Sequence, residues 1–199
     1  MKFRSNRGQS LVEMLVAISI IVVSLLGILA LINRSLGLNR VVADQYIATY
    51  LAAEGIELVK NYFDHSYFIS SGPFYGWQGA GAIIPGVYQI GYDDSNAALS
   101  PLFSVSDPPT SDKIREWFFA PSGGFPSLAF LNFNNGNGVY SYNSGGTPTK
   151  FKRLIYIYNP TVYSGAAYEY TVTSAVGWTS RGGKFVVQLQ NHFLPWRTF

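Results

Sequence analysis

The chain has 199 residues, no cysteine and a formal net charge of +3 at pH 7. This length suits one modest domain with an anchor, and without cysteine the chain can form neither a disulfide framework nor a thiolate metal site. Lys2, Arg4 and Arg7 are three of the fourteen basic residues, so the remaining eleven balance the eleven acidic residues. The charge therefore gives no support to nucleic-acid binding.

A long apolar segment follows the basic N-terminus. No charged residue occurs between Met14 and Asn33, and a helix of this length spans roughly the 30 Å hydrocarbon core of a bilayer. A secretory signal would have a shorter apolar region of about 7–15 residues, followed by small residues. We therefore expect a membrane-spanning helix, and the basic residues before it place the N-terminus in the cytoplasm and the rest of the chain outside.

One carboxylate, that of Glu13, stands at the start of this apolar segment. An ionisable group beside a membrane span is costly to desolvate and usually has a partner. Position 9 lies one helical turn before Glu13, so both groups share a helix face about 6 Å apart along the axis. The alternative is that Glu13 simply lies in the headgroup zone at the end of the span.

The segment around Glu13 resembles the N-terminus of type IV pilins and pseudopilins. These prepilins carry a short basic leader ending in glycine, a glutamate as the fifth mature residue and a long apolar helix, and here Gly8, Gln9 and Glu13 occupy the matching positions. The resemblance covers about the first 33 residues. It implies cleavage between Gly8 and Gln9 by prepilin peptidase and methylation of the new amino terminus. Phenylalanine is the usual first mature residue, and a glutamine there can cyclise and lose its positive charge.

The resemblance also implies an assembly role for Glu13, whose carboxylate would pair with the amino terminus of a neighbouring subunit in a filament. The implied partners are prepilin peptidase, other pilin-like subunits, and an assembly platform with its cytoplasmic ATPase. We expect the leader at 1–8, the membrane or filament-core helix at 9–33, an amphipathic stalk at 34–64 and a β-rich head at 65–199. The final location would be a filament at the cell surface or in the periplasm.

The predicted stalk rests on apolar residues at three- and four-residue steps. They are Leu36, Val41, Val42, Tyr46, Ile47, Tyr50, Leu51, Leu58, Val59 and Tyr62. We interpret Glu54 and Glu57 as part of the solvated helix face. Residues 52–57 are also similar to the stalk of certain minor pilins.

The first part of the head has few regular patterns. We expect a loop over 64–85, where Ser, Gly and Pro end the helical periodicity, and a strand over 86–92. Asp93 to Asn96 reads as a turn, because a calcium site needs about six oxygen ligands in a defined loop. Residues 101–124 have no clear pattern, and their expected docking points are Ile114, Trp117 and Phe118.

The second part of the head predicts antiparallel strands. Residues 128–133 and 139–142 flank an Asn- and Gly-rich turn and suggest a hairpin. Alternation over 168–178 predicts a strand with one buried and one wet face, paired with a following strand that ends near Phe193. The almost wholly apolar 151–158 segment predicts a central strand packed on the stalk helix. The fold class is therefore α+β, which the resemblance also implies.

We expect no enzyme and no cofactor. His65 and His192 have no acidic or thiol group at metal-ligand spacing, and no phosphate-binding glycine loop is present. Lys150, Lys152 and Arg153 would give only a weak, salt-sensitive contact with nucleic acid, so we interpret them as charges that protect an edge strand. The alternative to a filament subunit is an uncleaved single-pass protein that displays a binding domain on the cell surface.

Overall fold

The computed structural model describes part of the chain. The described residues are 7–69, 85–91, 109–119, 128–142, 145–158, 161–163, 167–180 and 183–194, with only the backbone of 7–9, 65–69, 161–163 and 167–168. The chain divides into two compact units, Met1–Asp44 and Gln45–Phe199. The turn predicted at Asp93 to Asn96 lies outside the described residues.

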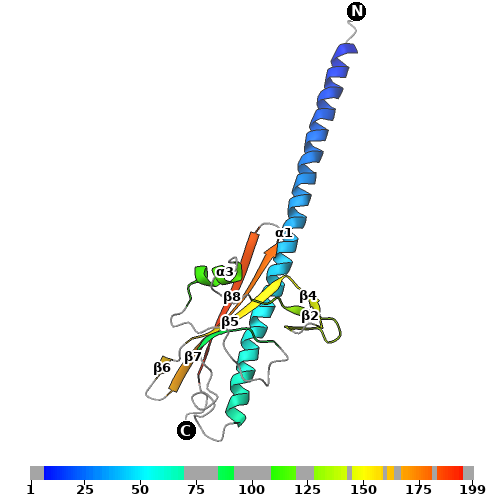
Figure 1. Ribbon diagram of the computed structural model, residues 1–199. Helices are drawn as coiled ribbons and strands as arrows, with labels where there is room; N and C mark the ends of the chain where they lie inside the picture. The colour runs from blue at the N-terminus through cyan, green and yellow to red at the C-terminus, as the bar shows by residue number, and fades with distance from the viewer. Residues whose placement is uncertain are drawn as a thin grey trace, which may run out of the picture. The chain divides into compact units, whose positions relative to one another are not determined.

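Helix α1, Arg7–Ile69, runs through both units in sequence (Figure 1). No proline interrupts this segment, so no position lacks the backbone donor that an α-helix needs. The helix continues past Asp64, and the prediction that a loop begins there is wrong. Leu58, Val59 and Phe63 are buried in one core cluster, so tertiary packing supports the helix up to the predicted end of the stalk.

The buried face of α1 in the second unit differs from the predicted stripe. Leu51, Leu58 and Val59 are buried as expected, but Tyr46, Ile47 and Tyr50 are exposed. Small residues and one phenylalanine complete the buried face: Ala48, Ala52, Gly55 and Phe63. The reason is steric, because small side chains let the helix approach the sheet closely and the bulkier tyrosines lie beside this contact.

A five-stranded antiparallel sheet forms the head (Figure 1). Its strands are β1 (Gly86–Tyr88), β5 (Phe151–Ile157), β6 (Thr161–Tyr163), β7 (Ala167–Ser180) and β8 (Gly183–Phe193). β5 lies between β1 and β7, and β8 pairs along the other side of β7. β6 pairs with the first residues of β7. A long N-terminal helix followed by an antiparallel sheet confirms the α+β class.

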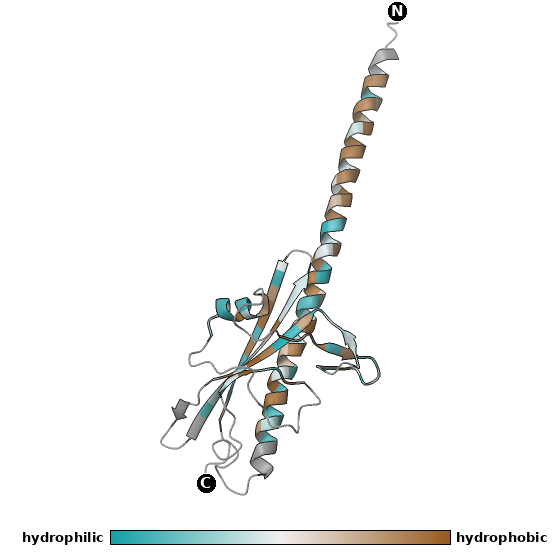
Figure 2. Cartoon of the chain, viewed as in Figure 1, coloured by the Kyte–Doolittle hydropathy of each residue, from teal (hydrophilic) through white to brown (hydrophobic). Residues whose placement is uncertain are grey.

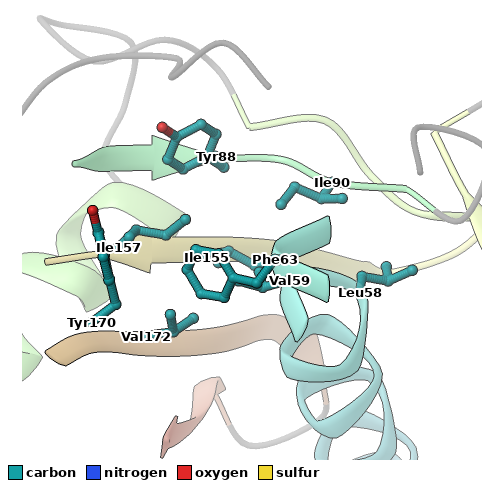
Figure 3. Packing of buried hydrophobic residues seen from close by; sticks show 9 residues of the cluster. All are labelled: Leu58, Val59, Phe63, Tyr88, Ile90, Ile155, Ile157, Tyr170 and Val172. Atoms are coloured by element: carbon teal, nitrogen blue, oxygen red, sulfur yellow. The ribbon is translucent and has the colours of Figure 1, made fainter. Parts of the chain in front are cut away.

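The helix packs on one face of this sheet. Leu58, Val59 and Phe63 of α1 form a core cluster with Ile155 of β5 and Val172 of β7, as Figure 3 shows. A second cluster joins Ala48, Leu51 and Ala52 to side chains at the other end of the strands, Phe151, Val176 and Trp178. The helix therefore runs antiparallel to β7, and the prediction of a central strand at 151–158 packed on the stalk is confirmed.

The opposite face of the sheet is covered by helix α3, Ser111–Phe119. Its buried residues are the expected docking points Ile114, Trp117 and Phe118. They pack over Ala175 of β7, and Thr173 and Gly177 on the same face are buried too. The prediction that β7 has one wet face is therefore wrong, because α3 supplies a cover that the strand's own alternation does not reveal.

The predicted hairpin is present, with shorter strands than expected. β2 (Asn132–Asn134) pairs with β3 (Val139–Ser141), and β4 (Thr147–Pro148) pairs along the other side of β2. The Gly138 N–H donates to the Asn134 carbonyl at 2.8 Å, and Gly138 has a φ of 72°. This left-handed conformation is the one that glycine adopts without steric cost.

Candidate processing and assembly site

The three predicted site residues lie on one helix. Gly8, Gln9 and Glu13 all fall within the first two turns of α1, Gly8 and Gln9 being described by their backbone alone. Positions 9 and 13 are four residues apart in the helix, which corresponds to about 6 Å along the axis. The structure therefore presents the predicted cleavage point and the carboxylate one turn apart.

The Glu13 side chain is exposed, and no ion pair involving it is found among the described residues. It stands at the N-terminal edge of the apolar part of α1. A carboxylate in this place is hydrated in water and would be costly to bury against an apolar neighbour without a cation. The group is thus available for a partner outside this chain.

The helix beyond Glu13 is mostly apolar, as the brown ribbon of Figure 2 shows, and its large apolar side chains form an unburied surface. Its large apolar side chains between Leu11 and Ile32 are 47–70% exposed. By length and composition, the helix is apolar enough to cross a membrane. Exposure on this scale in a water-soluble protein would promote aggregation, so the surface needs a lipid or protein environment.

Two serines within this apolar segment satisfy their own hydroxyls. Ser19 Oγ donates to the Leu15 carbonyl at 2.7 Å, and Ser24 Oγ donates to the Ile20 carbonyl at 2.8 Å. A hydroxyl that is bonded within its own helix avoids most of the cost of leaving water. These residues are therefore compatible with a hydrocarbon or helix-packed environment.

Of the two histidines, only His192 has a described side chain. His192 Nδ1 lies 2.5 Å from Glu169 Oε1 on the exposed surface of β7 and β8, and its other neighbours are Thr171 and Gln190. The side chain of His65 lies outside the described residues. Within the described part of the chain, no group of three or more His, Cys, Asp or Glu is suited to a metal ion.

The basic cluster at 150–153 does not protect an edge strand, and this prediction is wrong. β5 is an internal strand, and the Arg153 side chain is completely buried. The part of β5 that β1 does not reach is covered in another way. The Leu131 N–H donates to the Phe151 carbonyl, and the side chains of Gln89 and Tyr142 donate to the Arg153 carbonyl. Lys152 instead lies over the Phe130 ring, 4.6 Å from its centroid.

Glu54 is also placed differently from the prediction. Its Oε2 atom lies 3.5 Å from Arg153 Nη1, and its side chain is 30% exposed. Arg153 Nη1 also donates to the Leu51 carbonyl at 3.2 Å, and Nη2 donates to the Ile90 carbonyl at 2.6 Å. Glu54 is therefore the counter-ion of a buried cation, whereas Glu57 is exposed as expected.

An open groove of about 330 Å³ lies beside this ion pair, lined by Ile47, Tyr50, Leu51, Glu54 and Tyr140. Burial, and then the nearby Glu54 carboxylate, raise the pKa of the Tyr140 phenol. The Tyr50 hydroxyl lies 2.8 Å from that of Tyr46, and this hydrogen bond raises the pKa of Tyr50. The carboxylate in the groove is already paired, so the lining offers little to a charged ligand.

Sequence reasoning missed the Arg153–Glu54 pair because the two residues are about a hundred positions apart and neither stands out locally. A signal was nevertheless present. Arg153 lies inside an apolar strand pattern, and a cation predicted to be buried requires a buried acceptor. Glu54 and Gly55 each lie one helical turn from both Leu51 and Leu58 of the predicted apolar stripe, and this spacing was the matching feature.

Comparison with known proteins adds one match. Residues 3–31 match the family model described as the prokaryotic N-terminal methylation motif. The match includes Gly8, Gln9, Glu13 and most of the unburied apolar segment. No curated protein and no solved structure matches the chain.

Proposed function

Since this chain is a type IV pilin-like protein at its N-terminus, we propose that it is a structural subunit of a type IV pilus-like or type II secretion-like filament. In this proposal the chain is cleaved after Gly8 and assembled through its N-terminal helix. The similarity of residues 52–57 to minor-pilin stalks favours a minor subunit.

The single observation that carries the proposal is the exposed Glu13 carboxylate at the start of the unburied apolar helix. Helices of this kind bury their apolar surface when they bundle, but bundling would also bury a charge. Cleavage after Gly8 would create a new amine at Gln9. An amine on one subunit and Glu13 on the next would neutralise each other, and the bundle would then contain no unpaired charge.

The proposed pairing also explains why the cleavage point lies so near the carboxylate. Position 9 is one helical turn from position 13, so two parallel helices need only a small axial offset to bring the amine of one to the Glu13 of the other. If Gln9 cyclised, its amine would lose its charge and this pair would weaken. The protein should therefore carry an uncyclised, methylated Gln9 when it is assembled.

The membrane is the proposed starting point of assembly. Residues 1–8 form the cytoplasmic leader, 9–33 the membrane and later filament-core helix, 34–64 the stalk and 65–199 the external head. Lys2, Arg4 and Arg7 favour this orientation by the positive-inside rule. The proposed partners are prepilin peptidase, other pilin-like subunits, and the assembly platform with its ATPase.

The second candidate is an uncleaved single-pass protein with an external binding domain. The groove beside Glu54 is the observation that favours it, since a displayed head needs a surface that contacts a ligand. This alternative requires no special relation between Gly8 and Glu13. The two candidates therefore differ in the state of the N-terminus.

The decisive experiment is mass spectrometry of the N-terminal peptide of the protein purified from its native membrane. A peptide that begins at Gln9, with or without a methyl group, supports peptidase processing and filament assembly. An intact Met1 or Lys2 terminus contradicts the filament proposal and favours the displayed binding domain. Detection of pyroglutamate at Gln9 would still support cleavage after Gly8, but it would contradict the pairing of a charged amine with Glu13.

A further inference from the structure

Arg153 ties three segments of the head together from a completely buried position on β5. Its guanidinium donates to the carbonyl of Leu51 on α1 at 3.2 Å and to the carbonyl of Ile90 after β1 at 2.6 Å. Nη1 also lies 3.5 Å from Glu54 Oε2. One side chain thus binds two groups of the stalk helix and one group of a neighbouring segment.

The burial of the Arg153–Glu54 ion pair does not by itself explain a gain in folding stability. A buried ion pair loses the hydration of both charges, and replacement by apolar residues of similar size is often neutral or stabilising. Arg153 Nε and the nearby Ser174 Oγ also lie buried without a hydrogen-bond partner. The best-attested use of such a buried polar group is to select one packing register among several.

The pattern of apolar residues on α1 does not by itself define the axial position of the helix on the sheet. The buried positions of this face repeat at three- and four-residue steps: Ala48, Leu51, Ala52, Gly55, Leu58, Val59 and Phe63. If the helix slid by four residues, Ala52 would replace Ala48, Val59 would replace Gly55 and Phe63 would replace Val59. Nearly every buried position would remain apolar, so the change in buried apolar area opposes such a slip only weakly, and side-chain size and charge must select the register.

Two adjacent residues oppose this slip directly. At Gly55, an added Cβ would lie 2.4 Å from Ser174 Oγ and 3.0 Å from Arg153 Cδ, so Val59 would clash there. The same slip would put Leu58 in place of Glu54 and leave the buried Arg153 without its carboxylate. The Glu54-Gly55 pair therefore matches the Arg153 site in one register only.

We infer that Arg153 is a positioning residue that, with Glu54 and Gly55, fixes the axial register of helix α1 on the sheet of the head. This inference goes beyond the proposed function and does not depend on it, since it concerns the head of a single chain. Its importance for a filament subunit is plain, however. Repeating subunits need the same relation between helix and head, and a four-residue slip would change it by about 6 Å.

The absence of cysteine allows a direct measurement in the full-length protein. Spin labels are attached at Lys60→Cys on α1 and Thr179→Cys on β7, both exposed positions. These sites lie toward opposite ends of the helix–sheet contact. A slip of α1 that moves Val59 into the place of Gly55 would therefore shorten the distance between the labels. Pulsed double electron–electron resonance in detergent reports this distance as a distribution.

The unmodified Arg153 protein should give one narrow distance distribution. Arg153→Met combined with Ser174→Ala, which also removes the hydroxyl that Val59 would meet, should add a second population about 6 Å shorter, while the circular dichroism of the folded head is retained. The addition of Glu54→Gln to these two changes should give the same second population, and it leaves no unpaired charge at the site. Ser174→Ala alone is the matched control, because it removes the same hydroxyl but retains Arg153 and its bonds.

A single unchanged distance in both Arg153 variants would overturn the inference, because apolar packing alone would then set the register. Loss of folding in both variants would also contradict the inference, because the head would then need the ion pair in order to fold at all, whatever the register of α1. A second label pair, Thr179→Cys with Gln190→Cys, lies wholly within the sheet and should not change. None of these results alters the N-terminal peptide, so failure of the register and failure of the filament proposal remain distinguishable.

Discussion

The ring of Phe118 lies directly over Gly177, so closely that a Cβ on Gly177 would come within 2.6 Å of the ring atoms Cγ and Cδ1. Phe118 belongs to α3 and Gly177 to β7, which makes this the closest described approach of that helix to the sheet at a glycine. This contact explains why the face of β7 that is turned away from α1 is buried at this end of the strand. The glycine supplies space here, and its φ is not positive.

Substitution of Gly177 by alanine should therefore destabilise the head. The added methyl group must displace Phe118 near the base of its side chain, and overpacking of this kind typically costs about 1–3 kcal/mol of unfolding free energy. Chemical denaturation of the purified protein would measure the change. Gly145→Ala is the control, since an added Cβ there meets nothing within 4 Å. Equal midpoints for the two variants would contradict the close contact.

The head should lose stability in alkaline solution through Tyr88. Burial, and then the neighbouring Tyr62, raise the pKa of Tyr88 to about 12 from its ordinary value of 10.0. The folded state thus holds the phenol proton more tightly than the unfolded state. This contribution is fully present below pH 10, and it is lost as the pH rises from 10 towards 12.

Urea unfolding at a series of pH values would test this expectation. Tyr88→Phe should show a smaller decline in unfolding free energy across that window than the unmodified protein. A constant offset at every pH would report only the loss of the hydroxyl. Identical slopes for the two proteins would show that another group controls the alkaline transition.

Replacement of Glu13 by glutamine should separate processing from assembly. The variant keeps the shape of the side chain but cannot neutralise an amine, so it should be inserted and cleaved normally and yet be largely missing from sheared filaments. Quantitative immunoblotting of membrane and filament fractions would measure the ratio. Glu13→Asp keeps the charge and serves as the matched variant. Normal incorporation of the glutamine variant would refute the proposed pair.

A bulky residue at Gly8 should block processing. Gly8→Leu places a side chain at the proposed cleavage point and should leave the full-length precursor in the membrane. Gly8→Ala, with the smallest possible addition, should be cleaved at least partly. Gel mobility and N-terminal mass spectrometry would distinguish the two forms, and an unchanged terminus in the leucine variant would place the cleavage elsewhere.

The sequence predicted best where a local pattern controls the structure. The apolar N-terminal helix, the hairpin around Asn134 to Gly138, and the β7–β8 pair all follow from periodicity or turn chemistry within a short segment. The central position of 151–158 could also be predicted, because a strand apolar on both faces needs two covers. Ile114, Trp117 and Phe118 were recognised as docking points even though their helix was not.

The failures have a common physical origin in contacts between distant segments. The dry second face of β7 depends on α3, which lies about sixty residues earlier in the chain. Glu54 and Arg153 looked like surface charges because each was judged by its neighbours in sequence. Tyr46 and Tyr50 fit the apolar stripe by spacing, yet the small residues Ala48, Ala52 and Gly55 decide which face approaches the sheet.

The position of β5, β7 and β8 near the C-terminus has a consequence for synthesis. Most of the residues that cover the face of α1 with Ala48, Leu51 and Phe63 lie within 151–193, so this face leaves the ribosome well before its cover is complete. At typical rates of about 5–20 residues per second, this interval is on the order of ten seconds. During that time the nascent chain exposes the stalk's apolar face as well as its membrane segment. We therefore expect early-terminated chains that lack β7 and β8 to be captured by chaperones or degraded, even when their N-terminal helix has already entered the membrane.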